Sequence, residues 1–366
     1  MTILKLLAFG DTGGFRSFIL FFGFWEGGVD VETLEDLAKR LKVSRRTVSR
    51  VLTNDKNVAL ATRKKIQSFL KGTDFVPNEQ AARLAGRRVP VVGLVFPESF
   101  LPTLDDYVAQ VIRGVLGVAH QKKHQVTFYA FRSLDVTEVL RLYRGKMVGG
   151  FIFVAFGEGD FNALQNLKRK GVPFVNVGLL CPGVYSVDCD NEKGGFLATE
   201  HLVSSGRRRV AFLHGDPSWS SSRERFKGYQ RALKEAGVPF RSEFVQTAYY
   251  SDTAAHQTVL KLFSTLPRPD ALFAANDLMS IGAYAAFREL KIKVPRDVSL
   301  IGFDDNPVCS MPILETTLSS VHQPMREMAS AATDVLLTLM EGEEQGALFH
   351  RLFEPRLVVR QSSSFS

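Results

Sequence analysis

Short apolar runs that alternate with helical stretches make up most of the sequence after residue 90, and this alternation restricts the fold more than any other feature. The runs are rich in β-branched and aromatic residues, which is typical of buried strands. We expect strands at 91–96, 125–129, 150–155, 174–177, 209–214, 271–274 and 299–303. Helices are expected between them, for example at 104–121 and 223–236. Strands separated by helices form parallel sheets covered on both faces, so the sequence predicts an α/β protein with two such sheets.

A different pattern precedes these strands, between residues 31 and 86. Apolar residues recur at helical spacing on both sides of a tight turn at 41–44, which predicts two short helices. These residues are Leu34, Leu37, Ala38 and Leu41 before the turn and Val48, Val51 and Leu52 after it. Thr33 and Asp36 fit a capping box for the first helix, and Ser44 is a suitable N-cap whose hydroxyl can accept from the amide near Thr47. Two short helices joined by a tight turn form a helix-turn-helix, whose second helix lies in the DNA major groove.

A third helix is expected at about 60–71, where Ile66, Phe69 and Leu70 can complete a three-helix core. It should end near 72–74, and the residues FVPN lead into a short segment at 79–85 with helical propensity. So short a helix is marginal on its own in water. Residues 86–90, GRRVP, are typical of a flexible basic linker.

Positive charge is concentrated in the same part of the chain. The formal net charge is +8, and residues 31–90 alone hold fourteen Lys and Arg against six Asp and Glu, so this segment carries the whole excess. Lys and Arg gain affinity for DNA by releasing condensed counterions. On the second helix Arg45, Arg46, Ser49 and Arg50 point away from the apolar stripe. A solvated basic face is the alternative, and the accompanying helix-turn-helix favours DNA binding.

Several motifs from residue 33 onward together resemble the LacI/GalR family of bacterial transcriptional repressors. They are TLEDLAKRLKVSRRTVSRVL, NV followed by TRKKI, FVPN and ARLAG, and the resemblance covers roughly nine tenths of the chain. It implies an N-terminal all-α helix-turn-helix DNA-binding domain and a two-lobed effector domain similar to periplasmic binding proteins. The expected boundaries are 31–77 for the DNA-binding domain, 78–90 for a hinge helix and linker, and 91–366 for the effector and dimerisation domain. Lobe 1 is expected at about 91–188 and 321–354, and lobe 2 at about 189–320 and 355–366.

The resemblance assigns roles to residues on the DNA side. In this family the recognition helix reads half of a palindromic operator, and hinge helices of the dimer insert a leucine into the central minor-groove step. Leu84 matches that leucine by position, and its alternative is packing on the effector domain. Arg45 and Arg46 would read bases, and Arg50 would read a base or hold a phosphate. The expected DNA-binding residues are Thr33, Ser44, Arg45, Arg46, Thr47, Ser49, Arg50, Asn78, Arg83 and Leu84.

The resemblance also implies an effector site in the cleft between the lobes. Arg225, Asn276 and Asp304 match family effector positions in lobe 2, and Tyr250 matches a position where the family often has an aromatic ring. Arginine, amide and carboxylate groups that converge on a cleft suit hydroxyl-rich ligands. Each of these four residues could instead have a purely structural role. Arg225 and Asp304 could form an internal ion pair, Asn276 could cap its helix, and Tyr250 could belong to the core.

The sequence of lobe 1 predicts less about the ligand than that of lobe 2. Phe96 and Ser99 lie at the end of the first strand, where the family places ligand contacts, and both are expected effector contacts. After Ser99 the sequence PESFLPTLDDY departs from the usual pattern, which leaves the identity of the ligand open.

Motifs of enzymes and metal sites do not occur in the sequence. It contains no GxSxG, P-loop or HExxH, and its seven histidines are scattered. The three cysteines, Cys181, Cys189 and Cys309, lack metal-ligand spacing and suit a reducing cytoplasm. We therefore expect no enzyme activity, no cofactor and no metal.

Residues 1–30 match nothing in the family and are expected to form an extension, either a poorly ordered arm or residues upstream of the true start. Their apolar run at 18–25 is too short to span a bilayer. Lys5 and Arg16 precede this run, as in a signal peptide, but no small-residue cleavage site follows. We expect a cytoplasmic protein without membrane contacts.

The sequence as a whole predicts a homodimeric repressor on a pseudo-palindromic operator, controlled by a sugar or sugar derivative bound between the lobes. After Arg360 only QSSSFS remains, with no leucine heptad, so a dimer is expected rather than a tetramer. A purine- or nucleoside-responsive regulator shares every DNA-side feature and differs in the pocket. A regulator driven by a partner protein is a further alternative. A solute-binding protein without a transcriptional role would need an export signal.

Overall fold

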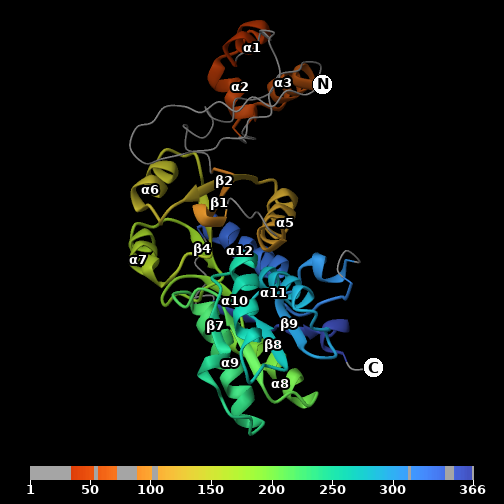
Figure 1. The fold of residues 1–366 in the computed structure, drawn as a ribbon. Coiled ribbons are helices and arrows are strands. Elements are labelled where there is room, and N and C mark those ends of the chain that lie inside the picture. The colour runs from red at the N-terminus through yellow and green to blue at the C-terminus, as the bar shows by residue number, and fades with distance from the viewer. Residues whose placement is uncertain are drawn as a thin grey trace, which may run out of the picture. The chain divides into compact units, whose positions relative to one another are not determined.

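The computed structural model describes residues 34–52, 57–71, 89–100, 106–311, 315–342 and 350–364. The chain divides into two compact units, residues 1–88 and residues 89–366, and each is described by itself (Figure 1). Several predictions lie outside the described residues, namely the extension at 1–30, the hinge helix at 79–85, and the residues Thr33, Asn78, Arg83 and Leu84.

Three helices form the described part of the first unit: α1 (Leu34–Leu41), α2 (Arg45–Leu52) and α3 (Leu60–Lys71). These bounds confirm the predicted turn at 41–44 and the third helix. The predicted apolar residues form one core, in which Leu37, Ala38, Leu41, Val48, Val51 and Ile66 are buried. Lys65 Nζ donates to the carbonyl of Leu41 at 3.1 Å, which joins α3 to the end of α1. The core follows from the spacing because residues three and four apart share one helix face.

The first sheet of the second unit is parallel throughout. Its strand order is β11 (His350–Phe353), β5 (Ser186–Cys189), β4 (Phe174–Val177), β3 (Gly150–Val154), β1 (Val91–Pro97) and β2 (Gln125–Phe131). Helices α5 (Asp106–Gln121) and α12 (Met325–Met340) cover one face and share a core with it. Helices α6 (Val136–Arg144) and α7 (Phe161–Arg169) cover the other face (Figure 1). This sheet with its four helices is the first lobe.

The second sheet is parallel except for its last pair, β10 with β12. Its order is β12 (Arg356–Val358), β10 (Ser319–His322), β9 (Ser299–Asp304), β8 (Ala271–Ala274), β6 (Val210–His214) and β7 (Val245–Thr247). Helices α8 (Asn191–Ser204) and α9 (Ser220–Glu235) pack together, as do α10 (Asp252–Ser264) and α11 (Asp277–Glu289). Phe303 faces Gly194 of α8, and the neighbouring Gly302 faces Asp277 of α11. Successive strand residues point to opposite faces, so the two helix pairs cover opposite faces of this second lobe.

The chain passes between the two sheets three times in the described residues. It leaves the first sheet after β5, returns after β10, and leaves again between β11 and β12. Strand β10 lies wholly in the second sheet, so the return to the first lobe follows His322.

The predicted elements need several small corrections. Strand β6 begins at Val210, so Arg209 precedes it. Strand β3 ends at Val154, because Ala155 has a φ of 57° and cannot continue an extended strand. Strand β2 continues to Phe131, and α9 begins at Ser220 rather than 223. Strand β7, with three residues, was not predicted because so short a run has no readable alternation.

Candidate functional site

Ser44 holds the start of α2. Its hydroxyl oxygen accepts from the backbone N–H of Thr47 at 3.1 Å and lies 2.8 Å from the Thr47 hydroxyl. In the preceding turn Lys42 has a φ of 53°, and the N–H of Val43 donates to the carbonyl of Ala38 at 3.0 Å. These contacts close α1 directly before α2 begins, as the spacing of the N-cap predicted.

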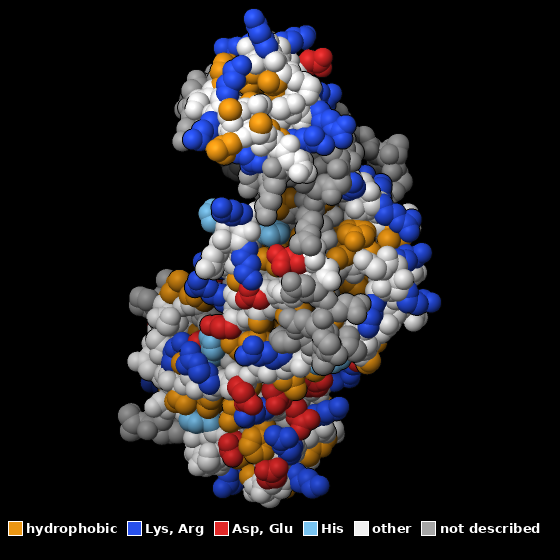
Figure 2. Space-filling model, turned by 180° about the vertical axis from the view of Figure 1, so that it is seen from behind, with side chains coloured by type: hydrophobic (Ala, Val, Ile, Leu, Met, Phe, Trp, Pro, Cys, Tyr) orange, Lys and Arg blue, Asp and Glu red, His pale blue; other side chains and the backbone are white. Residues whose placement is uncertain are grey.

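The side of α2 that faces away from the core is polar and basic. Arg45 and Arg46 are exposed in its first turn, while Thr47, Ser49 and Arg50 are partly exposed. On the face of this unit that Figure 2 shows, Lys and Arg side chains are prominent and Asp and Glu are few. A helix with this character can enter the major groove with its first turn toward the bases.

A cavity of about 50 Å³ lies between the two lobes of the second unit. It lies beyond the carboxyl ends of β8 and β9, which is where open α/β sheets bind ligands. The described residues that line it are Asp106, Tyr107, Gln110 and Met325 from the first lobe, Asn276, Asp277, Leu278, Ile281, Asp304 and Asn306 from the second, and Gln323 after β10. The cavity is smaller than the roughly 300 Å³ of common ligand pockets.

Arg225, on α9, is buried next to this cavity. Its guanidinium donates to Asn191 Oδ1 at 2.9 Å, to the carbonyl of Ala275 at 2.6 Å and to Gln323 Oε1 at 3.0 Å. It also lies 3.6 Å from the centre of the Phe303 ring and 4.0 Å from Asp304 Oδ1. Arg225 therefore forms an ion pair with Asp304 inside the second lobe and also lies close to the cleft, because Asp304 itself lines the cavity.

Asn276 and Asp304 lie at the cavity itself. Asn276 caps α11, with its Oδ1 accepting from the N–H of Met279 at 2.9 Å, as the alternative interpretation expected. Asp304 ends β9 with a φ of 106°, a left-handed value that is strained for a residue with a Cβ. Such strain occurs most often at ligand-binding sites.

Tyr250 does not line the cavity of the described residues. Its ring lies against Gly215, where a Cβ would overlap it, and its centre is 5.9 Å from that of Trp219. The residue packs against the core of the second lobe. Its hydroxyl is nevertheless buried without a hydrogen-bond partner among the described residues.

Phe96 and Ser99 are also not brought to this cavity. Phe96 is buried in the core between the first sheet and helices α5 and α12. Ser99 is exposed in the short helix η1 (Glu98–Phe100). The described first-lobe residues at the cavity are instead Asp106, Tyr107, Gln110 and Met325.

The sequence did not predict Asp106, Tyr107 and Gln110 as effector contacts, although they line the cavity from one side of α5. It also missed Gln323 and Met325, which follow β10 at the crossing between the lobes. A signal for the first group existed, because the polar residues Asp106 and Gln110 are one helical turn apart near the start of a helix whose other residues are mostly apolar.

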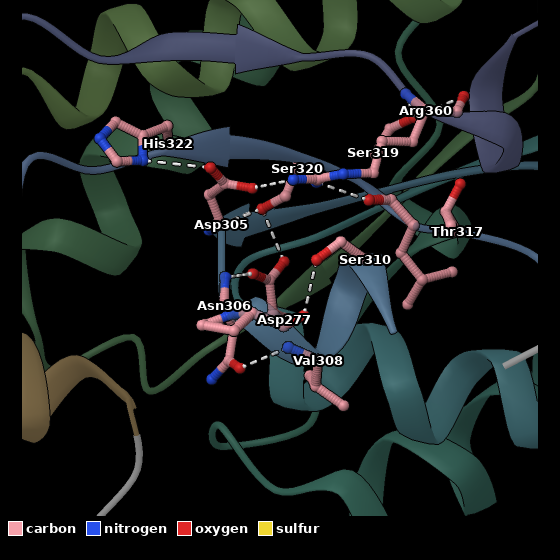
Figure 3. A network of polar contacts seen from close by, with 12 residues as sticks. Asp277, Asp305, Asn306, Val308, Ser310, Thr317, Ser319, Ser320, His322 and Arg360 are labelled. Carbon is pink, nitrogen blue, oxygen red and sulfur yellow. Dashed lines mark hydrogen bonds and ion pairs between the residues drawn. The ribbon is translucent and has the colours of Figure 1, made fainter. Parts of the chain in front are cut away.

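A polar network lies behind the second-lobe wall (Figure 3). Asp277 accepts from the N–H of Asn306 and from the Ser320 hydroxyl, both at 2.7 Å. Burial raises the pKa of Asp277 to about 7, although both hydrogen bonds favour its ionised form. The Ser320 oxygen also accepts from the N–H of Asp305 at 3.0 Å. Asp277 therefore connects three elements: the start of α11, the residues that follow β9, and β10.

Asp305 extends this network toward the C-terminal segment. It pairs with Arg360 at 2.6 Å and with His322 Nδ1 at 3.1 Å. Burial opposes its ionisation, but the hydrogen bonds from His322 and Arg360 hold the pKa of Asp305 below its usual range. The network thus ties the segment after β12 to the strand ends that surround the cavity.

A three-helix unit with a basic second helix, followed by a two-lobed fold with an interlobe cavity, defines a DNA-binding regulator that responds to a ligand. Residues 33–78 match the family described as bacterial regulatory proteins, lacI family, and residues 199–363 match the periplasmic binding protein-like domain. The transcriptional regulator CelR of Thermobifida fusca is 31% identical over 336 residues, which cover 90% of this chain and 98% of CelR.

Two solved structures share the fold over 90% of this chain. A CelR–cellobiose complex, covered to 99%, has a TM-score of 0.68 and 31% identity. A lac repressor dimer bound to operator and the anti-inducer ONPF, covered to 98%, has a TM-score of 0.79 and 26% identity. The chain belongs to the LacI family of bacterial regulatory proteins. It is a transcriptional regulator and not an enzyme.

Two features are absent from the described residues. No described helix is long and apolar enough to cross a membrane. Within the same residues, His, Cys, Asp and Glu do not gather into a group that could hold a metal ion.

Proposed function

We propose that this protein is a homodimeric transcriptional repressor that binds a pseudo-palindromic operator and is controlled by a sugar or sugar derivative bound between its lobes. The observation that carries the proposal is the interlobe cavity, at which Asn276 and Asp304 lie with Arg225 directly behind. The cellobiose bound to CelR supports a sugar as the ligand class. Binding to the chromosome would place the protein in the bacterial cytoplasm.

On the DNA side, we assign base reading to Arg45 and Arg46, which are exposed in the first turn of α2. Arg50 reads a base or holds a phosphate, and Ser44, Thr47 and Ser49 position the helix on the backbone. The remaining assignments, Thr33, Asn78, Arg83 and the wedge residue Leu84, rest on the resemblance.

The relative orientation of the lobes links ligand binding to operator binding. A ligand that contacts both walls of the cavity changes the equilibrium between relative orientations of the lobes, and a ligand shifts such an equilibrium only by its differential affinity. In a dimer this change alters the spacing of the two linkers and so the stability of a marginal hinge helix. Induction and corepression both follow from this scheme.

A gel shift on the DNA upstream of the protein's own gene tests the repressor function. We expect sequence-specific binding that weakens steeply with salt. Arg45→Ala should cost roughly 1–3 kcal/mol and relax one operator position, whereas a uniform loss across sequences would mark a phosphate contact. Lys234→Ala, which removes an exposed charge of α9, is the matched control and should leave binding unchanged. Absence of any sequence-specific shift would refute the proposal.

A purine- or nucleoside-responsive regulator is the second candidate. The observation in its favour is Tyr107, an aromatic side chain in the cavity wall that could stack on a base. Thermal unfolding in the presence of nucleobases, nucleosides and sugars separates the two, because a ligand at 100 times its dissociation constant stabilises the folded protein by about 2.7 kcal/mol.

A further inference from the structure

The amino ends of β1, β2, β3 and β4 form one edge of the first lobe, because these strands are parallel neighbours in the sheet. The segments that lead into them are residues 89–90, 121–124, 144–149 and 168–173, which we call the first-lobe edge. Three backbone hydrogen bonds of 2.8–2.9 Å connect these segments, from the N–H groups of Gln125, Gly149 and Phe151 to the carbonyls of Pro90, Val91 and Pro173. The edge lies opposite the interlobe cavity, whose wall residue Asp106 follows the carboxyl end of β1.

The first-lobe edge is basic. Its segments contain no Asp or Glu and seven Lys and Arg, namely Lys122, Lys123, Arg144, Lys146, Lys168, Arg169 and Lys170. All of these except the half-buried Lys146 are exposed. Helix α12 brings two carboxylates near: Asp334 pairs with Lys122 at 2.8 Å, and Glu341 follows Met340, whose side chain lies against Gly149. Within the described residues, no ion pair is formed by Lys123, Arg144, Arg169 or Lys170.

Helix ends explain part of this charge. Helices α5, α6 and α7 end at the first-lobe edge, and Lys and Arg near the C-terminus of a helix interact favourably with its dipole. The corresponding edge of the second lobe is also basic, and consists of residues 205–209, 236–244, 265–270 and 290–298. There, however, Glu243, Asp270 and Asp297 lie among the cations, and each pairs with an arginine. The first-lobe edge has no acidic residue in its own segments, so its cations remain available to an external anion.

The linker distinguishes the first-lobe edge further. The chain that comes from the DNA-binding unit enters the second unit at Val89 and Pro90, on this edge, and continues into β1 between β2 and β3. Residues 72–88 connect the end of α3 with Val89, and a chain of this length spans at most about 60 Å. DNA that is bound by α2 is therefore tethered to the first-lobe edge and to no other edge of the second unit. A tether of this kind raises the effective concentration of the anion near the cations.

We propose that the first-lobe edge is a second DNA-binding surface, which contacts phosphates of the duplex without reading its sequence. Exposed Lys and Arg without acidic neighbours suit a polyanion, because each phosphate that they neutralise releases condensed counterions. Phosphate contacts carry no base information, so the edge adds affinity and salt dependence and leaves the choice of operator to α2. This inference goes beyond the proposed function, in which only the first unit and the hinge segment contact DNA.

The test is the salt dependence of DNA binding by the full-length protein, measured by fluorescence anisotropy. The two probes are a duplex of random sequence and the DNA upstream of the protein's own gene. The edge variant combines Arg144→Gln, Arg169→Gln and Lys170→Gln, three exposed cations of the first-lobe edge. Each cation that holds a phosphate contributes about 0.9 to the slope of log affinity against log salt. We expect the slope to decrease by about 1 to 3 and the affinity for both duplexes to fall about 10-fold or more at low salt.

Two further variants separate a phosphate contact from a change in net charge or in folding. The combination of Lys234→Gln, Arg268→Gln and Lys293→Gln removes three exposed cations of the second lobe and is the matched control. It changes the net charge by the same amount and should leave slope and affinity unchanged. The combination of Arg144→Lys, Arg169→Lys and Lys170→Arg keeps the charge of the first-lobe edge and should keep the original slope. Thermal unfolding of each variant should give the midpoint of the original protein within a few degrees.

Several results would overturn the inference. One is an unchanged slope and affinity in the edge variant, and another is an equal loss in the second-lobe control, which would reflect net charge alone. A loss confined to the upstream DNA also overturns it, because such a loss would mean that the substitutions act on the operator-specific complex. Binding of poly-L-glutamate that disappears in the edge variant while duplex binding persists would assign the edge to an acidic protein instead.

The outcome is separable from that of the proposed repressor function. If the original protein prefers its upstream DNA and the edge variant binds both duplexes equally well as the original does, the edge inference fails and the repressor function stands. If the original protein binds both duplexes with equal affinity and the edge variant loses affinity for both, operator recognition fails and the edge inference stands.

Discussion

The second lobe meets the cavity through groups that its own interior already holds, whereas the first lobe meets it mainly through one turn of a helix. Arg225 has three hydrogen-bond partners in and beside its lobe, Asn276 caps α11, and Asp277 joins two strands and a helix. Asp106 instead depends on Gln110 and a mostly exposed arginine. The difference indicates that the second-lobe wall of the cavity is pre-organised and that the first-lobe wall is more adjustable.

The largest effect is expected for Arg225. Arg225→Ala leaves the Asn191 side chain, the Ala275 carbonyl and Gln323 without their partner in a buried region, so we expect a loss of about 3–5 kcal/mol in the free energy of unfolding. Urea denaturation measures this change. Arg231→Ala, on the same helix but more exposed, should cost less than about 1 kcal/mol. Similar losses in the two variants would contradict the idea of a pre-organised second lobe.

The next effect concerns pH and Asp277. Burial raises the pKa of Asp277 from 3.8 in the unfolded chain to about 7 in the folded protein. Between these values the folded state keeps a proton that the unfolded state loses, so this group makes the protein less stable as pH rises and contributes no further change above about pH 7. Asp277→Asn removes that contribution. From about pH 5 to 7.5 the free energy of unfolding of the variant should rise by about 3 kcal/mol relative to the original protein.

The first sheet provides a second case for the same measurement. Burial, with a contribution from Glu224, also raises the pKa of Asp188 in β5 to about 7. Asp188→Asn should therefore show a similar change in urea denaturation across this pH range, and the double variant should show both. Parallel pH profiles for the original protein and both variants would mean that neither carboxyl is protonated in the folded state.

Two tyrosines of the second lobe test how completely its polar groups are paired. Tyr229 donates to the carbonyl of Val210 at 2.9 Å, so Tyr229→Phe should cost about 1 kcal/mol in the free energy of unfolding. The Tyr250 hydroxyl has no partner among the described residues, so Tyr250→Phe should cost nothing or stabilise slightly. Urea denaturation of both variants in parallel measures the two changes, and each variant serves as the control for the other. A larger loss in Tyr250→Phe would show that its hydroxyl is paired in solution.

A small effect is also expected for an ion pair that connects the lobes. Arg223 of α9 reaches Glu158 of the short helix η2 (Glu158–Asp160) at 2.5 Å, and both side chains are more than a third exposed. A double-mutant cycle of Arg223→Ala and Glu158→Ala should give a coupling energy below about 1 kcal/mol that decreases with salt. A coupling energy as large as the loss of unfolding free energy in Arg225→Ala would mean that this ion pair stabilises the protein as much as the buried contacts of Arg225 do.

The sequence predicted the parts whose signals are local. The three helices of the first unit were predicted because apolar residues three and four apart produce one buried face, and Ser44 was recognised from its position before α2. Asn276 and Asp304 were predicted because they match effector positions of the LacI/GalR family, and both lie at the cavity. Phe96 was predicted from the same resemblance but is buried in the core, since its side chain points to the face that α5 and α12 cover.

By itself, the sequence determined a helix-turn-helix, a pair of parallel sheets and the family to which they belong, because spacing, capping and strand alternation are properties of neighbouring residues. Only the tertiary structure decided which side chains meet at the cavity. Asp106 and Asp304 are almost two hundred residues apart and belong to different lobes, so their common cavity depends on how the crossing segments place the two lobes.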